Sequence, residues 1–266
     1  MSEPTAFVRL DRDTPHIAEI VLDRPEALNA VSTELARQLT VACSAAADDA
    51  GVRVAVLSSS GPKAFCVGAD LKERNALSDD ELRASRLVSR AAYRSVLDLP
   101  VPVVVAVHGF ALGGGLELAL AGDLIVVDPS AVLGLPEVSV GIIPGGGGTQ
   151  LLARRLGWSR AADLIFTARR LDAAEAQQIG LVDRLADPGQ DRAVALELAS
   201  RIAANSPVGV RNAKRAMRQG LDLPLAEGLE VEDICWAATA FSADRVEGLR
   251  AFAERRPPAW PERPDG

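Results

Sequence analysis

Two glutamates in apolar surroundings are the side chains of this 266-residue sequence best suited to moving protons. Glu117 stands in the aliphatic segment LELALA, and Glu137 follows a proline in a second apolar stretch. A carboxylate is rarely buried without a partner, and two carboxylates in one water-poor cleft raise each other's pKa values. Such a pair can serve as general acid and general base. Taken singly, Glu117 could instead form a buried ion pair or balance a helix N-terminus, and Glu137 could be a surface carboxylate.

A glycine run directly before Glu117, residues 113–115, adds a second chemical feature. The run follows an apolar, strand-like segment and opens a helical one, where free main-chain N–H groups and the helix dipole favour negative charge. Glycine also lets a ligand approach the backbone closely. The run could equally serve tight packing of the helix on a strand. Neither this run nor the one at 145–148 has the spacing of a dinucleotide-binding loop or a P-loop.

Composition and charge limit the partners of the protein. The 29 basic and 36 acidic residues give a net charge of -7, which argues against a general nucleic-acid binder but allows a local basic pocket. The three cysteines lie far apart and form no CxxC pair, so neither a disulfide framework nor a structural zinc site is expected. The N-terminus lacks the pattern of a secretory signal, and no uncharged run is long enough to span a membrane. We therefore expect a cytoplasmic protein with no metal and no membrane span.

Alternating strand and helix patterns must position the candidate groups. The wholly aliphatic segment 101–107 predicts a strand buried on both faces. Ser78 and Glu81 form a capping box that opens a helix over 78–97. Strands that alternate with helices indicate an α/β fold with crossover connections. The other predicted strands lie at 7–10, 17–22, 52–57 and 124–127, and other helices begin at about 32 and within 113–115.

The second half of the chain is mainly helical. Asp172 and Glu175 form another capping-box pattern. We expect an α/β catalytic core over residues 1–185 and a helical region over 186–266 that has no catalytic site of its own. Long helical patterns in that region lie at about 190–204, 207–219, 223–241 and 243–255.

Two long motifs resemble those of the crotonase superfamily, and within it the enoyl-CoA hydratases. The first is ALGGGLE, residues 111–117, and the second is PEVSVGIIPGGGGTQ, residues 136–150. The resemblance extends from residue 22 to residue 252, and segments 142–150, 164–169 and 255–258 are also similar to methylglutaconyl-CoA hydratases. It implies a crotonase-like core of ββα repeats wound in a spiral. The C-terminal helices of such proteins assemble trimers or dimers of trimers, so a homotrimer or hexamer is expected.

The resemblance also implies the catalytic residues and the reaction. The main-chain amides of Ala69 and Gly114 would hold the thioester oxygen of an acyl-CoA substrate. Glu117 would orient a water and take its proton as the water attacks C3 of a trans-2-enoyl-CoA, and Glu137 would supply a proton to C2. One shared water could exchange protons with both carboxylates, so the two roles are less firmly assigned than the pair. No metal or redox cofactor is implied.

Coenzyme A binding is implied for a further set of positions. Lys63 and Arg255 match family positions near the nucleotide phosphates, and Trp236 matches an aromatic residue that reaches the adenine from a neighbouring subunit. Each could instead be a surface cation or a packing aromatic. Glu26 stands where many relatives have a basic residue, and Leu135 where many have a polar one. The loop around Ala69 contributes Cys66, Gly68, Asp70 and Leu71 to the predicted ligand-binding set.

Three other functions compete with that of an enoyl-CoA hydratase. An enoyl-CoA isomerase or a methylglutaconyl-CoA hydratase would use the same site. A noncatalytic, RNA-binding protein is the alternative from another functional class. The excess of acidic over basic residues and the presence of only three lysines argue against RNA binding. A Ser–His–Asp hydrolase is not expected because no Gly-x-Ser-x-Gly elbow is present. His108, at the end of a buried strand, is expected to be structural, and Cys66 to be a small apolar residue instead of a reactive thiol.

Overall fold

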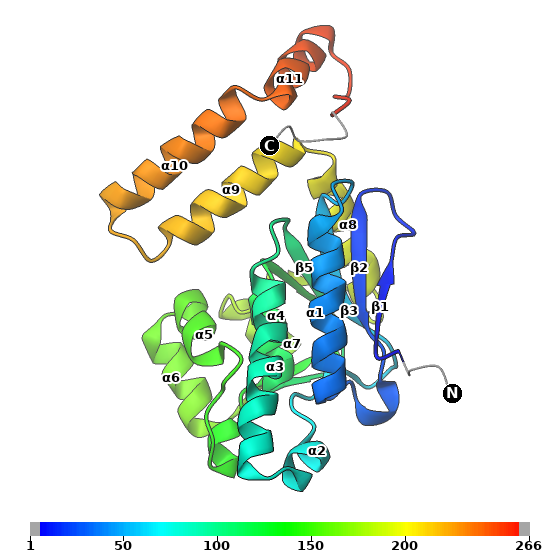
Figure 1. Cartoon of the computed structure of the whole chain (residues 1–266), viewed down its shortest axis with the longest axis vertical. Helices are drawn as coiled ribbons and strands as arrows, with labels where there is room; N and C mark the ends of the chain where they lie inside the picture. The colour runs from blue at the N-terminus through cyan, green and yellow to red at the C-terminus, as the bar shows by residue number, and fades with distance from the viewer. Residues whose placement is uncertain (1–5, 261–266) are drawn as a thin grey trace.

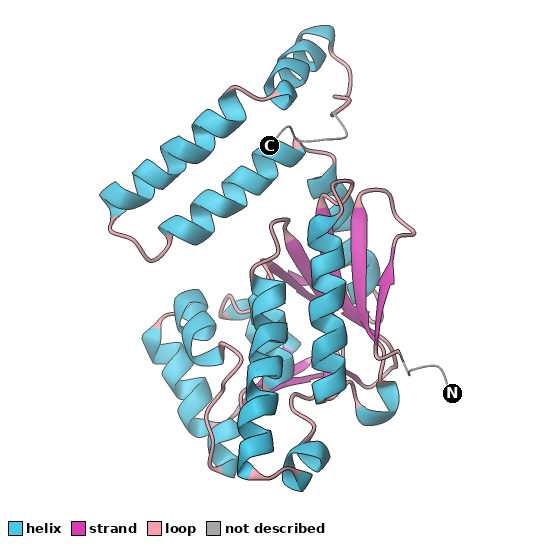
Figure 2. Cartoon of the chain, in the orientation of Figure 1, coloured by secondary structure: helices cyan, strands magenta, loops and turns pink. Residues whose placement is uncertain are grey.

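Two sheets form the centre of the molecule, which a computed structural model describes for residues 6–260 (Figure 2). Pairing within both sheets is parallel except for β1 with β2 and β8 with β9. The larger sheet has the order β1 (Val8–Asp11), β2 (Ile17–Leu22), β3 (Val54–Ser59), β5 (Val103–Val107), β7 (Leu124–Val127) and β10 (Arg184–Leu185). The smaller has the order β4 (Ala64–Cys66), β6 (Phe110–Leu112), β8 (Val132–Gly134) and β9 (Arg170–Asp172).

A repeated order of elements produces these two sheets. The first repeat places both of its strands, β1 and β2, in the larger sheet before α1. The three repeats that start at β3, β5 and β7 each place one strand in the larger sheet, the next strand in the smaller sheet, and then at least one helix. The expected ββα repeat is therefore present. Because β4, β6 and β8 pair in parallel, their carboxyl ends meet at one edge of the smaller sheet. Those ends lead directly to Gly68, Gly114 and Glu137, so the repeat itself gathers the candidate site.

Helix α1 packs on β1 and β2 of the larger sheet, and α4 packs on β4 and β6 of the smaller sheet. Helix α3 contacts both α1 and α4 (Figure 1). Ser32 caps α1 by accepting from Leu35 N, and Ser78 with Glu81 forms the expected capping box of α3. Asp172 caps α7 as expected, but the Glu175 carboxylate binds Arg169. The helices of the first part of the chain are α1 (Thr33–Asp48), α2 (Leu71–Ala76), α3 (Asp79–Leu97), α4 (Gly114–Ala121), α5 (Gly148–Leu156), α6 (Trp158–Thr167) and α7 (Ala173–Gln178).

The last four helices divide into one that packs on the core and three that extend from it. Helix α8 lays Ala195, Ala199 and Ala203 on the second face of the larger sheet. Helices α9 and α10 form a hairpin that projects away from the sheets and is followed by α11 (Figure 1). Lys214 and Arg218 of α9 both bind Asp123, which fixes α9 to the core. Their bounds are α8 (Asp191–Ala203), α9 (Pro207–Gly220), α10 (Leu225–Ala240) and α11 (Ala243–Glu254).

Among residues 6–260, no helix is long and apolar enough to cross a bilayer. The same residues hold no cluster of three or more His, Cys, Asp or Glu side chains suited to a metal ion. The cytoplasmic location and the division of the chain at residue 185 stay predictions.

Candidate active site

Two main-chain N–H groups meet where β4 and β6 end. Ala69 follows β4, and Gly114 is the first residue of α4, where a helix has no intrahelical acceptor for its N–H. Within residues 6–260, neither amide donates a hydrogen bond. Gly68 adopts φ +88°, and a Cβ at this position would lie 2.8 Å from Gly114 N. The absence of a side chain at Gly68 therefore leaves the Gly114 amide accessible beside that of Ala69.

Glu117 is buried in the first turn of α4. Its Oε1 accepts hydrogen bonds from Gly146 N at 2.6 Å and Gly148 N at 2.8 Å. Burial raises the pKa of Glu117, and the two N–H groups oppose this rise by stabilising the carboxylate. The aliphatic Leu135 approaches Gly148 next to this carboxylate, so apolar packing contributes to its burial. Glu117 is thus an oriented carboxylate with one oxygen fixed by the backbone.

Glu137 begins a short 3₁₀ turn, Glu137–Val140, directly after Pro136. Its side chain is half-buried, and its Oε2 has no hydrogen-bond partner in the part of the chain that the structure describes. Burial raises the pKa of Glu137 to about 7, and the charge of Glu117 contributes to this rise. Glu137 can therefore gain or lose a proton near neutral pH.

A cavity of about 800 Å³ joins these groups. Both glutamates line it, together with Gly68, Ala69 and Gly114. Its apolar wall includes Leu71, Leu82, Val140, Ile142 and Ile143. The arrangement offers two amide donors for an oxyanion, two carboxylates for proton transfer and apolar side chains for an alkyl group.

Comparisons with known proteins agree with this geometry. The sequence model described as Enoyl-CoA hydratase/isomerase matches residues 12–263. The chain belongs to the enoyl-CoA hydratase/isomerase family. A Bacillus subtilis protein with the same family name, YngF, is 47% identical over 91% of this chain and 93% of its own. Human mitochondrial methylglutaconyl-CoA hydratase is 42% identical over 94% of this chain and 75% of its own. The crystal structure of an enoyl-CoA hydratase from Bacillus anthracis is similar, with a TM-score of 0.94 at 40% identity, covering 96% of this chain and 99% of that one.

The residues expected to hold coenzyme A lie in three places. Leu71, Gly68 and Ala69 line the cavity, whereas Lys63 is exposed in the loop that precedes β4. Trp236 of α10 is 63% exposed, and Arg255 is the exposed left-handed cap of α11. Neither Trp236 nor Arg255 lines the cavity of its own chain. The prediction that Trp236 serves a neighbouring subunit is untested by a single chain.

Cys66 and Asp70, two further members of the predicted ligand-binding set, also lie outside the cavity lining. Cys66 is fully buried, with its Sγ accepting from Gly68 N, and burial raises the pKa of this thiol to about 12. Asp70 caps α2 through Lys72 N and Glu73 N, and it pairs with Arg24 at 2.7 Å. Both side chains direct their hydrogen bonds to neighbouring groups of the protein. They therefore hold the loop that presents Ala69 in place.

The cavity also contains residues that the sequence analysis did not select. Tyr93 of α3 lines it, and a Cβ on Gly114 would lie 2.1 Å from the Tyr93 hydroxyl. Arg74 and Arg86 line it as well, and Arg86 donates to Gly145 O. No local motif marks these residues, because α2 and α3 reach the site only through tertiary packing. The Glu26 carboxylate is exposed and lies 3.8 Å from the guanidinium of Arg24. Arg24 therefore places a positive charge next to the position where many relatives have a basic residue.

Proposed function

We propose that this protein is an enoyl-CoA hydratase, which adds water reversibly and syn to a trans-2-enoyl-CoA to give a 3-hydroxyacyl-CoA. The observation that supports the proposal most strongly is the pair Glu117 and Glu137 in one cavity with the amides of Ala69 and Gly114, which donate to no acceptor within residues 6–260. Proton transfer in both directions and stabilisation of an oxyanion are the two requirements of this addition.

The proposed reaction begins with the Glu117 carboxylate. Gly146 N and Gly148 N hold one of its oxygens, so the carboxylate is oriented before substrate arrives. Glu117 takes one proton of the water as the water oxygen bonds to C3. The C2–C3 double bond then supplies its electron pair toward C2 and the thioester, and the negative charge develops on the thioester oxygen. Glu137, protonated at neutral pH in an appreciable fraction of molecules, delivers the proton to C2.

The amides of Ala69 and Gly114 stabilise the thioester oxygen as it becomes an oxyanion. Backbone donors fixed by β4 and the start of α4 need no rearrangement during the reaction. One such donor contributes about 2.7–4 kcal/mol to transition-state stabilisation in other enzymes. Addition of water is redox-neutral, so the proposed chemistry requires neither a redox cofactor nor a metal.

Turnover of crotonyl-CoA by the purified protein tests the proposal. Loss of enoyl absorbance with formation of the 3-hydroxy thioester supports it, and oxygen-18 from labelled water must appear at C3. A trans-3-enoyl-CoA supplied to the same preparation measures isomerisation. Rapid isomerisation with no incorporation of labelled oxygen would identify an isomerase instead.

A second candidate substrate, 3-methylglutaconyl-CoA, is favoured by the arginines of the cavity. Arg74, Arg83 and Arg86 all line it, and Arg74 forms no ion pair within the described residues. A guanidinium in this position can pair with an anionic group of a ligand. A carboxylate at the far end of the acyl group is one such anion, and a phosphate of coenzyme A is another. Human methylglutaconyl-CoA hydratase is also one of the similar proteins.

Comparison of crotonyl-, decenoyl- and 3-methylglutaconyl-CoA separates these substrates. If Arg74 pairs with a distal carboxylate, Arg74→Gln raises KM for 3-methylglutaconyl-CoA about tenfold and leaves KM for crotonyl-CoA unchanged. An equal rise for both would assign Arg74 to coenzyme A. Arg37→Gln is the matched control, because Arg37 lies on the exposed surface of α1, pairs with Glu34 and does not line the cavity.

We also propose that the C-terminal helices assemble a homotrimer or hexamer. Large apolar side chains on α9, α10 and α11 are exposed in the single chain, which favours burial against other subunits. They include Met217, Leu225, Leu229, Ile234, Trp236, Phe241, Leu249 and Phe252. Sedimentation of a trimer or hexamer is expected, and an active monomer at micromolar concentration would contradict it. If Trp236 completes a neighbour's site, inactive Glu117→Gln and weakly binding Trp236→Ala chains should regain activity when co-assembled.

A further inference from the structure

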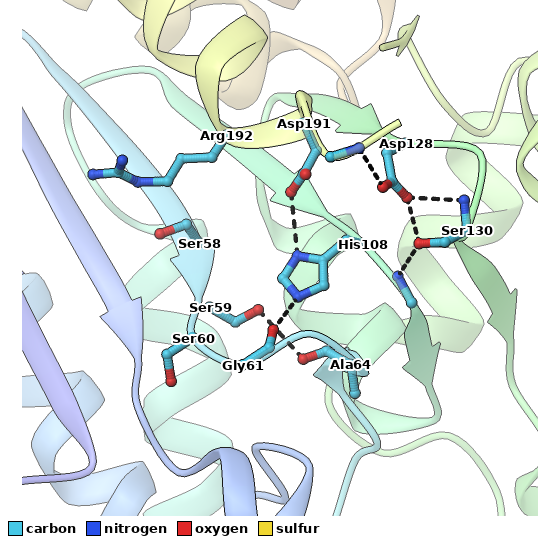
Figure 3. Close-up of polar contacts among 12 residues, drawn as sticks. Ser58, Ser59, Ser60, Gly61, Ala64, His108, Asp128, Ser130, Asp191 and Arg192 are labelled. Carbon is cyan, nitrogen blue, oxygen red and sulfur yellow. Dashed lines mark hydrogen bonds and ion pairs between the residues drawn. The ribbon is translucent and has the colours of Figure 1, made fainter. Parts of the chain in front are cut away.

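A side-chain network around His108 lies at the opposite end of β4 and β6 from the candidate oxyanion amides (Figure 3). His108 follows β5 and is only 16% exposed in its side chain. Its Nε2 lies 2.7 Å from Gly61 O, and its Nδ1 lies 3.3 Å from Asp191 Oδ2. Both neighbours are hydrogen-bond acceptors. A neutral imidazole has one N–H and satisfies only one of them, whereas an imidazolium donates to both.

The contacts of His108 join three segments that are distant in sequence. Gly61 belongs to the loop between β3 and β4, His108 precedes β6, and Asp191 is the first residue of α8. Main-chain hydrogen bonds join the segment that contains Gly61 to the segment that contains His108. Phe65 N donates to His108 O, and Phe110 N donates to Lys63 O. The ring of His108 therefore holds the starts of β4 and β6 against each other and against α8.

These two strands lead to both proposed oxyanion donors. β4 ends at Cys66, just before Gly68 and Ala69, and β6 ends at Leu112, just before the glycine run. Each strand is only three residues long, so a displacement at its start is carried almost directly to its end. The relative position of the two amides consequently depends on how firmly the two strand starts are held.

The charges that face His108 favour its protonated form. Asp191 from α8 has a side chain that is 8% exposed, and a carboxylate at a helix N-terminus is stabilised as an anion. Asp128, after β7, is the second acidic group near the ring, and it is held by Ser130 and by Gly189 N. The β3–β4 loop contributes the Gly61 carbonyl. Arg192, next to Asp191, binds Glu19 and points away from His108 (Figure 3).

We propose that His108, as an imidazolium bound to Asp191 and Gly61, is a positioning residue for the oxyanion hole and relaxes its hold on β4 and β6 when it loses its proton. The part of this proposal that concerns the oxyanion rests on the proposed hydratase function. His108 touches no cavity residue that reacts, and it acts through the two strands.

The direction of the pH effect follows from the same contacts. The hydrogen bond to Asp191 raises the pKa of His108 above its ordinary value of 6.5, and the Gly61 carbonyl adds to the rise. A group with a raised pKa in the folded state stabilises the fold fully at pH values below its unfolded pKa. That stabilisation is lost as the pH rises through the folded pKa. The network is therefore intact below about pH 6.5 and weakens as the pH rises through the raised pKa of His108.

Nuclear magnetic resonance of the intact protein labelled at histidine Cε1 tests the protonation state directly. The chain has two histidines, and the spectrum of His16→Asn assigns the remaining resonance to His108. We expect the pKa of His108 to lie above its ordinary value of 6.5, so that the imidazolium persists to higher pH. A His108 that titrates at or below its ordinary value of 6.5 would overturn the proposal.

Kinetics of His108→Gln tests the positioning role. A glutamine keeps one donor and carries no charge, so kcat should fall about tenfold at pH 6.5, the lower end for outer partners that orient catalytic groups. KM should change less than kcat, because the oxyanion develops only in the transition state. The ratio of wild-type to variant kcat should approach one as the pH rises. Any titration of Glu137 affects both proteins alike and cancels in this ratio.

A second variant and a control complete the experiment. Asp191→Asn should lower the pKa of His108, because the hydrogen bond to Asp191 is the main cause of its rise. The loss of kcat in this variant should become smaller as the pH is lowered and more of the ring is protonated. His16→Asn should leave the pH profile unchanged. A ratio that is one at every pH for both His108→Gln and Asp191→Asn would reject the positioning role. Wild-type protein that hydrates no enoyl-CoA would instead reject the proposed function, while the resonance titration would still decide the state of His108.

Discussion

Glu117 and Glu137 occupy the same cavity but sit in structures of different kinds. Glu117 belongs to a buried helix, and two main-chain N–H groups bind one of its oxygens. Glu137 belongs to a short 3₁₀ turn, and one of its oxygens has no partner among residues 6–260. The pKa of Glu137 rises to about 7, whereas hydrogen bonds restrain the rise at Glu117. The difference suits Glu117 to the role of oriented base and Glu137 to that of proton donor.

Replacement of either active-site glutamate is expected to cause the largest loss of activity. Glu117→Gln and Glu137→Gln should each lower kcat by at least about 10²-fold, because each deletes one proton-transfer step. Binding of a 3-hydroxyacyl-CoA product should change little, since the amide side chains occupy the same space. Glu34→Gln, on the exposed surface of α1, is the control for a glutamate outside the cavity. Full activity in either active-site variant would refute the two-carboxylate mechanism.

Substitution at Gly114 is expected to affect both activity and folding. Gly114→Ala would place a Cβ 2.1 Å from the Tyr93 hydroxyl, and overpacking of this kind costs about 1–3 kcal/mol of stability. Displacement of the amide should also lower kcat by about 10²-fold. Gly114→Val, with a larger side chain, should be worse in both respects. The sequence left open whether the glycine run faces a ligand or packs tightly, and Gly114 does both, because it lines the cavity and lies against the Tyr93 hydroxyl.

The double variant Gly114→Ala with Tyr93→Phe separates these two effects. Without the hydroxyl, the nearest ring atom of residue 93 would be 3.2 Å from the new Cβ, a contact that small shifts can relieve. Thermal stability should therefore recover toward that of Tyr93→Phe alone. If the double variant is as unstable as Gly114→Ala, the collision with Tyr93 is not the cause.

The pH dependence of hydration tests the role of Glu137 as proton donor. Hydration requires protonated Glu137, so kcat/KM for hydration should fall as the pH rises through about 7. Dehydration should show the same dependence of kcat/KM, because the reaction exchanges no proton with the solvent and its equilibrium constant fixes the ratio of the two values. The residual activity of Glu137→Gln should lack the fall near pH 7. A fall that persists in this variant would assign the titration to another group.

Chemical modification of cysteine is expected to have the smallest effect on activity. Cys43, Cys66 and Cys235 are buried, and burial raises the pKa of the Cys66 thiol to about 12. Thiolate is the reactive form, so the folded protein should react slowly with maleimide and keep its activity. Reaction in denaturant provides the reference rate. Fast inactivation of folded protein, prevented by an acyl-CoA, would instead place Cys66 at the ligand.

Local sequence patterns determined a substantial part of this structure. The capping box of Ser78 and Glu81 uses contacts within one turn of chain, and the aliphatic composition of 101–107 requires burial on both faces wherever the strand lies. The motifs around Gly114, Glu117 and Glu137 identified the family, whose sequence model matches residues 12–263. Such features depend on neighbours in the chain, so the order of residues alone specifies them.

Tertiary structure decided the features that depend on distant neighbours. The smaller sheet is built from three-residue strands, most of them close to glycines. Strands this short carry too little periodicity to be predicted from the sequence. They form because β4, β6 and β8 of successive repeats pair in parallel. Tyr93 and Arg74 carry no local signal. Tyr93 enters the cavity because α3 packs beside α4, and Arg74 lines it from α2. His108 was expected to be structural, and only the fold brings it to Gly61 and Asp191. In each case the free energy comes from contacts across the chain, and a linear sequence does not display them.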